Sequence, residues 1–190
     1  MSTCVPVYLC TCVPAKIETM TVALSLSEDQ LVSELWARDV RFLMGSQTSP
    51  APLLDPAHLI TSLAQSENAR MRLSLIPLFL RHPEFSAEAE NADELLALRT
   101  KQFVLRFYYT AAILLQRKYR KRIVEIFGEQ PELPDLFSSK LGVLPDENPD
   151  QALLQLANRH KFLSGQFVNW IGTYEHAAEV WLKEMELQKA

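Results

Sequence analysis

The sequence predicts an all-α protein: a single helical domain over residues 23–190, a bundle of five to seven helices with one long central helix. Three observations predict this fold class. Glycine is scarce, at 5 of 190 residues, whereas folds made mostly of strands use glycine in many tight turns. The 11 prolines gather in a few clusters separated by long proline-free stretches. Within those stretches apolar residues recur at intervals of three or four, the period of a helix with one buried face.

The first helix is expected at about 28–44. Ser27 precedes two acidic residues and Gln30, which is the pattern of a capping box at a helix N-terminus. Apolar side chains then follow at helical spacing as far as Gly45, a residue type that commonly ends helices. We therefore expect one helix from the capping box to that glycine.

Two further helices follow in the first half of the chain. Asp55 and Pro56 form an N-cap and first-turn pair, which predicts a helix over about 56–65. The helix after Ser66 is apolar on nearly all sides, as is typical of a central helix in a bundle. Pro77 lacks a backbone donor, so we expect a kink or a stop there.

The longest helix is expected at about 92–127, because no proline or glycine lies between Phe85 and Gly128. Such a helix would be roughly 50 Å long, so a break near its middle or a protruding end is also expected. The proline-rich residues 128–149 are predicted to form a loop that lies on the body. A short helix at 150–160 follows.

The last helix is expected from Ser164 to about Gln188, and its aromatic side chains are Trp170, Tyr174 and Trp181. Aromatic residues are enriched both in protein cores and at the centres of interfaces. Two interpretations stay open: the three rings belong to the core, or they form the interface of a homodimer or of a complex with a protein partner.

Residues 1–22 are predicted to be a disordered or loosely packed N-terminal tail. It contains all three cysteines, Cys4, Cys10 and Cys12, which is an odd number confined to one end and therefore no disulfide framework. Met20 precedes the first predicted helix cap closely, so the native protein either includes the residues before it or begins there.

Overall charge excludes some classes of function. The net charge is −4 with a pI near 5.6, which is typical of a cytoplasmic protein and unfavourable for non-specific binding to nucleic acid. No apolar run reaches the roughly 18–20 residues that span a bilayer, so no membrane partner is expected.

A basic cluster at residues 117–122 stands out against this acidic background. It places five cations in six positions: Arg117, Lys118, Arg120, Lys121 and Arg122. One interpretation is a solvated helix end, where cations interact favourably with the negative pole of the helix dipole. The other is a binding site for phosphate, nucleic acid or an acidic partner.

Arg106 lies within an apolar stretch, and a guanidinium cannot be buried without a partner or a route to solvent. Asp39, Glu175 and Glu179 are candidate partners for a structural ion pair. The alternative is a polar pocket inside the bundle, formed by Arg106, Asp39, Glu175 and His176, that binds a small anionic ligand or carries out catalysis.

Motifs for metals, cofactors and catalysis are missing from the sequence. His176 and Glu179 are three residues apart, but no second copy of the pair completes a metal site, so neither a metal nor a cofactor is predicted. The most favoured function is a non-catalytic helical interaction or regulatory protein that acts through its helix faces. Nucleic-acid or phosphate binding at residues 117–122, and an enzyme or anion-binding pocket around Arg106, remain as alternatives.

Overall fold

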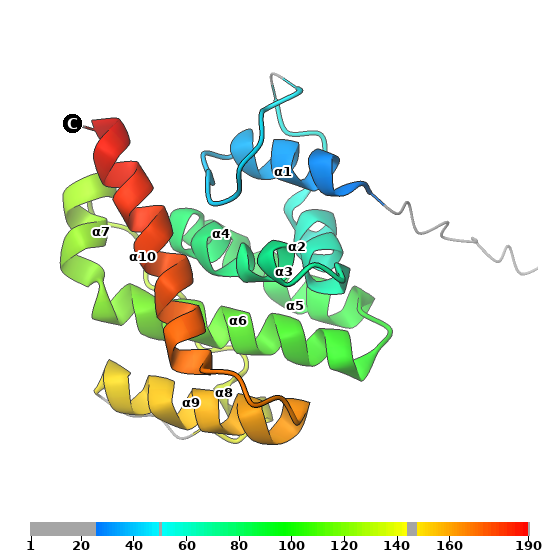
Figure 1. Ribbon diagram of the computed structural model, residues 1–190, viewed down its shortest axis with the longest axis vertical. Coiled ribbons are helices and arrows are strands. Elements are labelled where there is room, and N and C mark those ends of the chain that lie inside the picture. The colour runs from blue at the N-terminus through cyan, green and yellow to red at the C-terminus, as the bar shows by residue number, and fades with distance from the viewer. Residues whose placement is uncertain (1–25, 50, 144–147, 190) are drawn as a thin grey trace, which may run out of the picture.

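The computed structural model describes residues 26–49, 51–143 and 148–189, and these residues form helices and no strand (Figure 1). The all-α fold class is therefore confirmed for this part of the chain, whereas the tail predicted at residues 1–22 lies outside the described residues. No described helix is both long enough and apolar enough to cross a bilayer. The helices are more numerous than the expected five to seven. They are α1 (Glu28–Trp36), α2 (Pro56–Gln65), α3 (Ala69–Leu73), α4 (Leu75–Arg81), the 3₁₀ helix η1 (Pro83–Phe85), α5 (Ser86–Leu95), α6 (Arg99–Lys118), α7 (Arg120–Phe127), α8 (Ser138–Leu141), α9 (Pro149–Ser164) and α10 (Trp170–Lys189).

Helix α6 occupies the middle of the molecule. Its side chains are buried from Phe107 to Gln116 without interruption, so this helix is enclosed on all sides over three turns. Helices α4 and α9 pack against it, and α10 crosses it (Figure 1). Every described helix contributes side chains to one hydrophobic cluster. This cluster holds together segments that are far apart in the sequence.

The capping box at the start of α1 is confirmed. The Ser27 amide donates to the Gln30 side chain at 2.8 Å, and the Gln30 amide donates to the Ser27 hydroxyl at 3.2 Å. The helix ends at Trp36, however, well before the expected residue 44. The chain turns at Asp39, whose φ of 57° is left-handed, and aspartate is one of the few residues other than glycine that adopt this conformation readily.

The helix is interrupted near Pro77, as predicted. The break lies at Ser74, three residues before the proline. Pro77 has no N–H to donate to the carbonyl of Leu73, so the hydrogen-bond pattern of one continuous helix cannot form there. Helices α3 and α4 meet at Ser74, whose hydroxyl donates to the Met71 carbonyl at 2.6 Å. The Asp55 cap of α2 is also present, with the His58 amide donating to its carboxylate at 3.1 Å.

The single long helix expected at 92–127 is wrong, because three helices occupy this stretch. Helices α5 and α6 are separated at residues 96–98, where the Gln102 side chain donates to the carbonyls of Asp93 at 3.1 Å and Leu96 at 3.0 Å. Helices α6 and α7 are separated at Tyr119, where φ is −100° and ψ is 17°. Residues 92–127 are too long to pack along the core as one helix. The two breaks allow this amphipathic stretch to fold back over the core. The proline-rich segment that follows lies on the body as expected, with Leu133, Phe137 and Leu141 buried, but it is not all loop, because it contains the short helix α8.

The C-terminal third also departs from the expected boundaries. Helix α9 is longer than the predicted 150–160 and ends at Gly165, whose φ of 66° is left-handed. Residues 165–169 then form a connection, and α10 begins only at Trp170 rather than at Ser164. The Asn169 side chain accepts a hydrogen bond from the Gly172 amide at 3.1 Å and so caps α10.

Candidate functional site

The structure does not bring together the four residues of the polar pocket predicted around Arg106: Glu175 and His176 are neighbours on α10, whereas Arg106 and Asp39 have partners elsewhere. Arg106 binds Asp93 through two hydrogen bonds of 2.9 and 2.8 Å, and the Asp93 side chain is only 7% exposed. Asp39 is exposed and lies 3.4 Å from Arg81. Glu175 binds Lys118, and His176 is exposed to solvent. Arg106 is thus held by a structural ion pair, with a partner that the sequence did not indicate.

Three of the five cations in the basic cluster are held by carboxylates. Lys118 lies 2.5 Å from Asp150 and 2.6 Å from Glu175, so it joins the end of α6 to α9 and α10. These two carboxylates raise the pKa of the Lys118 ammonium above its usual value. Arg120 forms an ion pair with Glu132 at 2.7 Å, and Arg122 forms one with Glu186 at 2.8 Å. Arg117 and Lys121 are exposed and form no ion pair among the described residues.

The aromatic residues of the last helix lie in the core, so the first of their two interpretations describes the chain. Trp170 is 8% exposed, and Tyr174 and Trp181 are fully buried. Trp181 stacks on Phe127 of α7, with 5.3 Å between ring centroids. A partner surface at these three rings would require α10 to leave the core.

His160 of α9 is at the centre of an aromatic stack. Its ring lies between Phe107 of α6, with centroids 4.1 Å apart, and Trp170 of α10, with centroids 3.6 Å apart. Both neighbouring rings are nearly parallel to the imidazole, at 4° and 16°. Nδ1 of His160 shares a hydrogen bond of 2.5 Å with the Tyr174 hydroxyl. The stack depends on α10 starting at Trp170, since this start places the indole over the imidazole.

Burial lowers the pKa of His160 from its ordinary 6.5 to about 3, and the positive charge of Arg72 acts in the same direction. The imidazole is therefore neutral at physiological pH. Both of its faces are covered by rings, and one ring nitrogen is engaged by Tyr174. Such a histidine is a weak base near neutral pH and is suited to forming an apolar wall.

A cleft of about 450 Å³ opens beside this stack, between α3, α6, α9 and the connection to α10. Aromatic side chains line its inner wall: Phe103, Phe107, Tyr108 and Trp170. Three further lining side chains are charged: Glu67, Arg72 and Lys101. The arrangement can enclose an apolar group and present cations to it.

The connection from α9 to α10 continues the apolar surface outside the cleft. Phe162 is 76% exposed, Phe167 is 89% exposed and Val168 is 43% exposed. The Arg159 guanidinium lies 5.7 Å from the Phe162 ring centroid, and the Lys161 ammonium lies 5.0 Å from that of Phe167. We call residues 162–168 the apolar corner.

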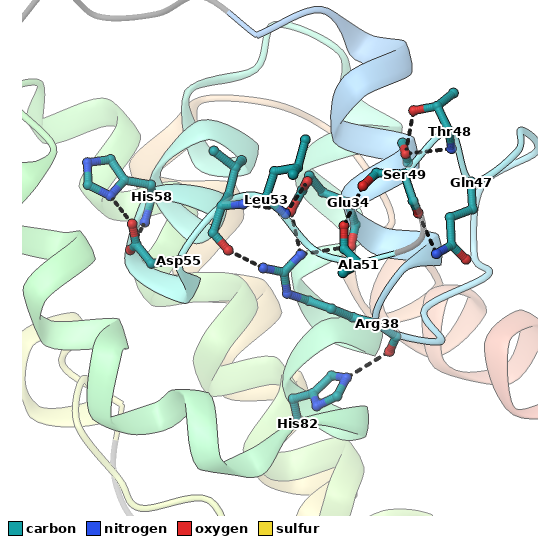
Figure 2. Close-up of polar contacts among 12 residues, drawn as sticks. Glu34, Arg38, Gln47, Thr48, Ser49, Ala51, Leu53, Asp55, His58 and His82 are labelled. Atoms are coloured by element: carbon teal, nitrogen blue, oxygen red, sulfur yellow. Dashed lines mark hydrogen bonds and ion pairs between the residues drawn. The ribbon is translucent and has the colours of Figure 1, made fainter.

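A second polar centre, which the sequence did not predict, lies beneath the loop between α1 and α2. Figure 2 shows Glu34 and Arg38 facing each other, with Arg38 Nη1 2.6 Å from the Glu34 carboxylate and both side chains 6% exposed. The same carboxylate accepts hydrogen bonds from the amides of Leu53 at 2.9 Å and Leu54 at 3.1 Å. His82 Nε2 lies 2.7 Å from the Arg38 carbonyl. The Glu34 carboxylate thus connects the loop to α1, and the Arg38 carbonyl connects it to His82 at the end of α4.

Burial alone would raise the pKa of Glu34. The hydrogen bond from Arg38 and those from the two loop amides outweigh burial, so the pKa of this carboxyl lies below its usual value. The carboxylate joins α1 to the backbone of the loop before α2, which is the arrangement of a structural anchor.

The sequence did not indicate the cleft, because its lining comes from positions as far apart as Arg72 and Trp170. The one local signal was Gly165, which ends α9 and sets the start of α10. Among the described residues, no three histidine, cysteine, aspartate or glutamate side chains come close enough together to hold a metal ion. No protein-family model, curated protein or solved structure matches the chain.

Proposed function

We propose that the protein is a non-catalytic binding protein of the interaction or regulatory class, and that the cleft holds a small, largely apolar ligand. The observation that carries the proposal is the cleft itself, whose volume of about 450 Å³ falls within the range of small-molecule sites. The half-buried Phe103 and Val104 offer apolar contact area, and Arg72 and Lys101 are the cations among its polar groups that would orient a ligand.

The state of His160 favours binding over catalysis. A general base works best when its pKa lies near the ambient pH, whereas the pKa of His160 is about 3. Its neutral ring instead packs between Phe107 and Trp170 and so supports the lining of the cleft.

The proposal can be tested with Nile red, a neutral dye that fluoresces in apolar sites. We expect one-to-one binding to the wild-type chain. Val104 lines the cleft and is half-buried, so Val104→Trp should fill the site and weaken binding at least 10-fold. The matched control is Val180→Trp, at an exposed position of α10 outside the cleft, which should bind as the wild type does. Equal binding by both variants, or no saturable binding to the wild type, would rule out the cleft as the site.

The apolar corner supports a second candidate function, the binding of a protein partner. Exposed aromatic rings next to Arg159 and Lys161 suit an acidic surface with apolar side chains. A photo-crosslinking residue at Phe167 should give one discrete adduct, which Phe162→Ser removes, while the same residue at exposed Leu187 gives none. An adduct of twice the chain mass would identify a homodimer. Identical adduct patterns at both positions would contradict this candidate.

Nucleic-acid or phosphate binding at residues 117–122 has less support than either candidate, because Lys118, Arg120 and Arg122 are held in ion pairs. Only two exposed cations of the cluster, Arg117 and Lys121, form no such pair among the described residues. Binding to DNA or RNA that weakens steeply with salt would favour this function.

A further inference from the structure

The charge of the cleft is opposite to that of the chain. Arg72 and Lys101 contribute two positive charges to its lining, and Glu67 contributes the one carboxylate. His160 is neutral, so the lining carries a net charge of +1, while the whole chain carries −4. A site of this sign on an acidic protein attracts anions and repels cations.

Arg72 and Lys101 differ in how their charge is neutralised. The Lys101 ammonium lies 2.6 Å from the Glu67 carboxylate and 3.0 Å from the Gln65 carbonyl. Arg72 forms no ion pair among the described residues; its Nη1 donates to the carbonyls of Ser66 and Glu67, at 2.8 Å each. Both bonds use the same nitrogen, and no carboxylate among the described residues lies within ion-pair distance of the guanidinium, although its charge helps to lower the pKa of the nearby Glu67 carboxyl.

The half-buried guanidinium of Arg72 lies close to the aromatic wall. It acts on the pKa of the Tyr108 hydroxyl through charge and a hydrogen bond, in opposition to burial, and it also lowers the pKa of His160. A guanidinium presents several N–H donors in a plane and matches a carboxylate with two parallel hydrogen bonds. An anion at Arg72 would therefore have its apolar part next to Tyr108 and the stacked rings.

Resting on the proposed function, we propose that the ligand is an aromatic monocarboxylate, with its carboxylate on Arg72 and its ring against the half-buried side chains of Phe103 and Val104. A single negative charge balances the net +1 of the lining, whereas a dianionic phosphate would exceed it. Phe103 provides aromatic contact for a planar ring system, while Phe107, Tyr108 and Trp170 border the cleft with less than a tenth of each side chain exposed.

The test compares naphthoate with naphthamide, which have nearly the same shape and differ in charge. Each is titrated into the wild-type protein by calorimetry and, independently, used to displace Nile red. Because hydrogen bonds to charged groups contribute about 1.5–3 kcal/mol, naphthoate should bind about 10- to 100-fold more tightly than naphthamide. Arg72→Gln should bring the two affinities together by weakening naphthoate alone.

Arg70→Gln is the matched control, since Arg70 is an exposed arginine of the same helix that does not line the cleft. It should keep the wild-type preference for naphthoate. Circular dichroism and thermal unfolding establish that each variant is folded. If Arg72→Gln does not fold, the preference is tested on the wild type with naphthylmethylammonium, which should bind more weakly than naphthamide.

Three results would overturn the inference, and they separate it from the proposed function. Equal binding of naphthoate and naphthamide to the wild type would refute the carboxylate and leave an apolar site. A preference for naphthoate that survives in folded Arg72→Gln would refute the role of Arg72. If neither compound nor Nile red binds, the proposed function fails as well.

Discussion

At the residue scale, the buried charges are the most sensitive positions. The Glu34 side chain is 6% exposed and is stabilised by Arg38 and by the amides of two loop residues. Removing one partner from such a pair leaves the other charge buried and unpaired, which costs more than the pair contributes when intact.

Glu34→Ala should therefore lower the free energy of unfolding by about 3–5 kcal/mol. The control is Asp29→Ala, an exposed acid in the same helix, for which the loss should stay under about 1 kcal/mol. Urea denaturation followed by circular dichroism measures both. Similar losses for the two variants would show that the pair is not an anchor.

His160 predicts how stability depends on pH. The folded chain protonates this residue only near pH 3, whereas the unfolded chain does so below about 6.5. Protons then bind preferentially to the unfolded chain, so stability is full above pH 6.5 and falls as the pH drops towards 3, by up to roughly 1.4 kcal/mol per unit. Protonation of Glu34 also lowers the stability of the folded chain in acid, but only below pH 4.5, the ordinary pKa of a glutamate side chain.

Urea denaturation between pH 7 and pH 5 measures this effect apart from that of Glu34. His160→Gln should be less dependent on pH in this window than the wild type. His176→Gln, at an exposed histidine, should keep the wild-type dependence. A wild-type slope retained by His160→Gln would mean that another group is responsible.

At the element scale, the ends of helices decide where the site forms. Gly165 ends α9 in a left-handed conformation and allows Trp170 to begin α10 over His160. A side chain at Gly165 meets nothing within 4 Å, and the same is true at Gly128, whose φ is 79°. Gly128 is far from the cleft along the chain, so it serves as a comparison for the effect on binding.

Gly165→Ala should cost about 1 kcal/mol of stability, because alanine is strained in the left-handed region, and Gly128→Ala should cost more, because its ψ of −173° lies in a region that only glycine adopts readily. Only Gly165→Ala should also weaken the binding of Nile red, since it alone disturbs the connection that carries Trp170. Thermal unfolding and dye titration measure the two effects. Equal dye binding by both variants would separate the α9–α10 connection from the site.

At the scale of the whole molecule, the basic cluster joins elements distant in sequence. Lys118 connects the end of α6 to Asp150 of α9 and Glu175 of α10, and Arg122 connects α7 to Glu186. The hydrophobic cluster brings these helices together, and the ion pairs then fix their ends.

Lys118→Met should accordingly lower the free energy of unfolding by about 1–2 kcal/mol, since the methylene stem is kept while two charged hydrogen bonds are lost. Lys121→Met should change it by less than about 0.5 kcal/mol, because Lys121 is exposed and forms no ion pair among the described residues. Chemical denaturation of both variants compares them. If Lys121→Met lowers the free energy of unfolding as much as Lys118→Met does, the ion pairs of Lys118 are not what stabilises the chain.

Sequence alone determined the local features of this protein, because they depend on neighbouring residues. The helical class follows from the spacing of apolar side chains, and the caps at Ser27 and Asp55 follow from side chains that bond amides three positions on. A structural ion pair at Arg106 was also predictable, because a guanidinium in an apolar stretch needs a partner.

Only the tertiary structure decided which distant groups meet. Arg106 reaches Asp93 because the chain breaks between α5 and α6; on one continuous helix, 13 residues would separate the two by about 20 Å. The cleft likewise exists because packing of the core brings Arg72 of α3, Phe107 of α6, and His160 and Trp170 of α9 and α10 to one place. Helical periodicity specifies which face of each helix is buried, whereas the partner of that face is set by how all the faces close together around one interior.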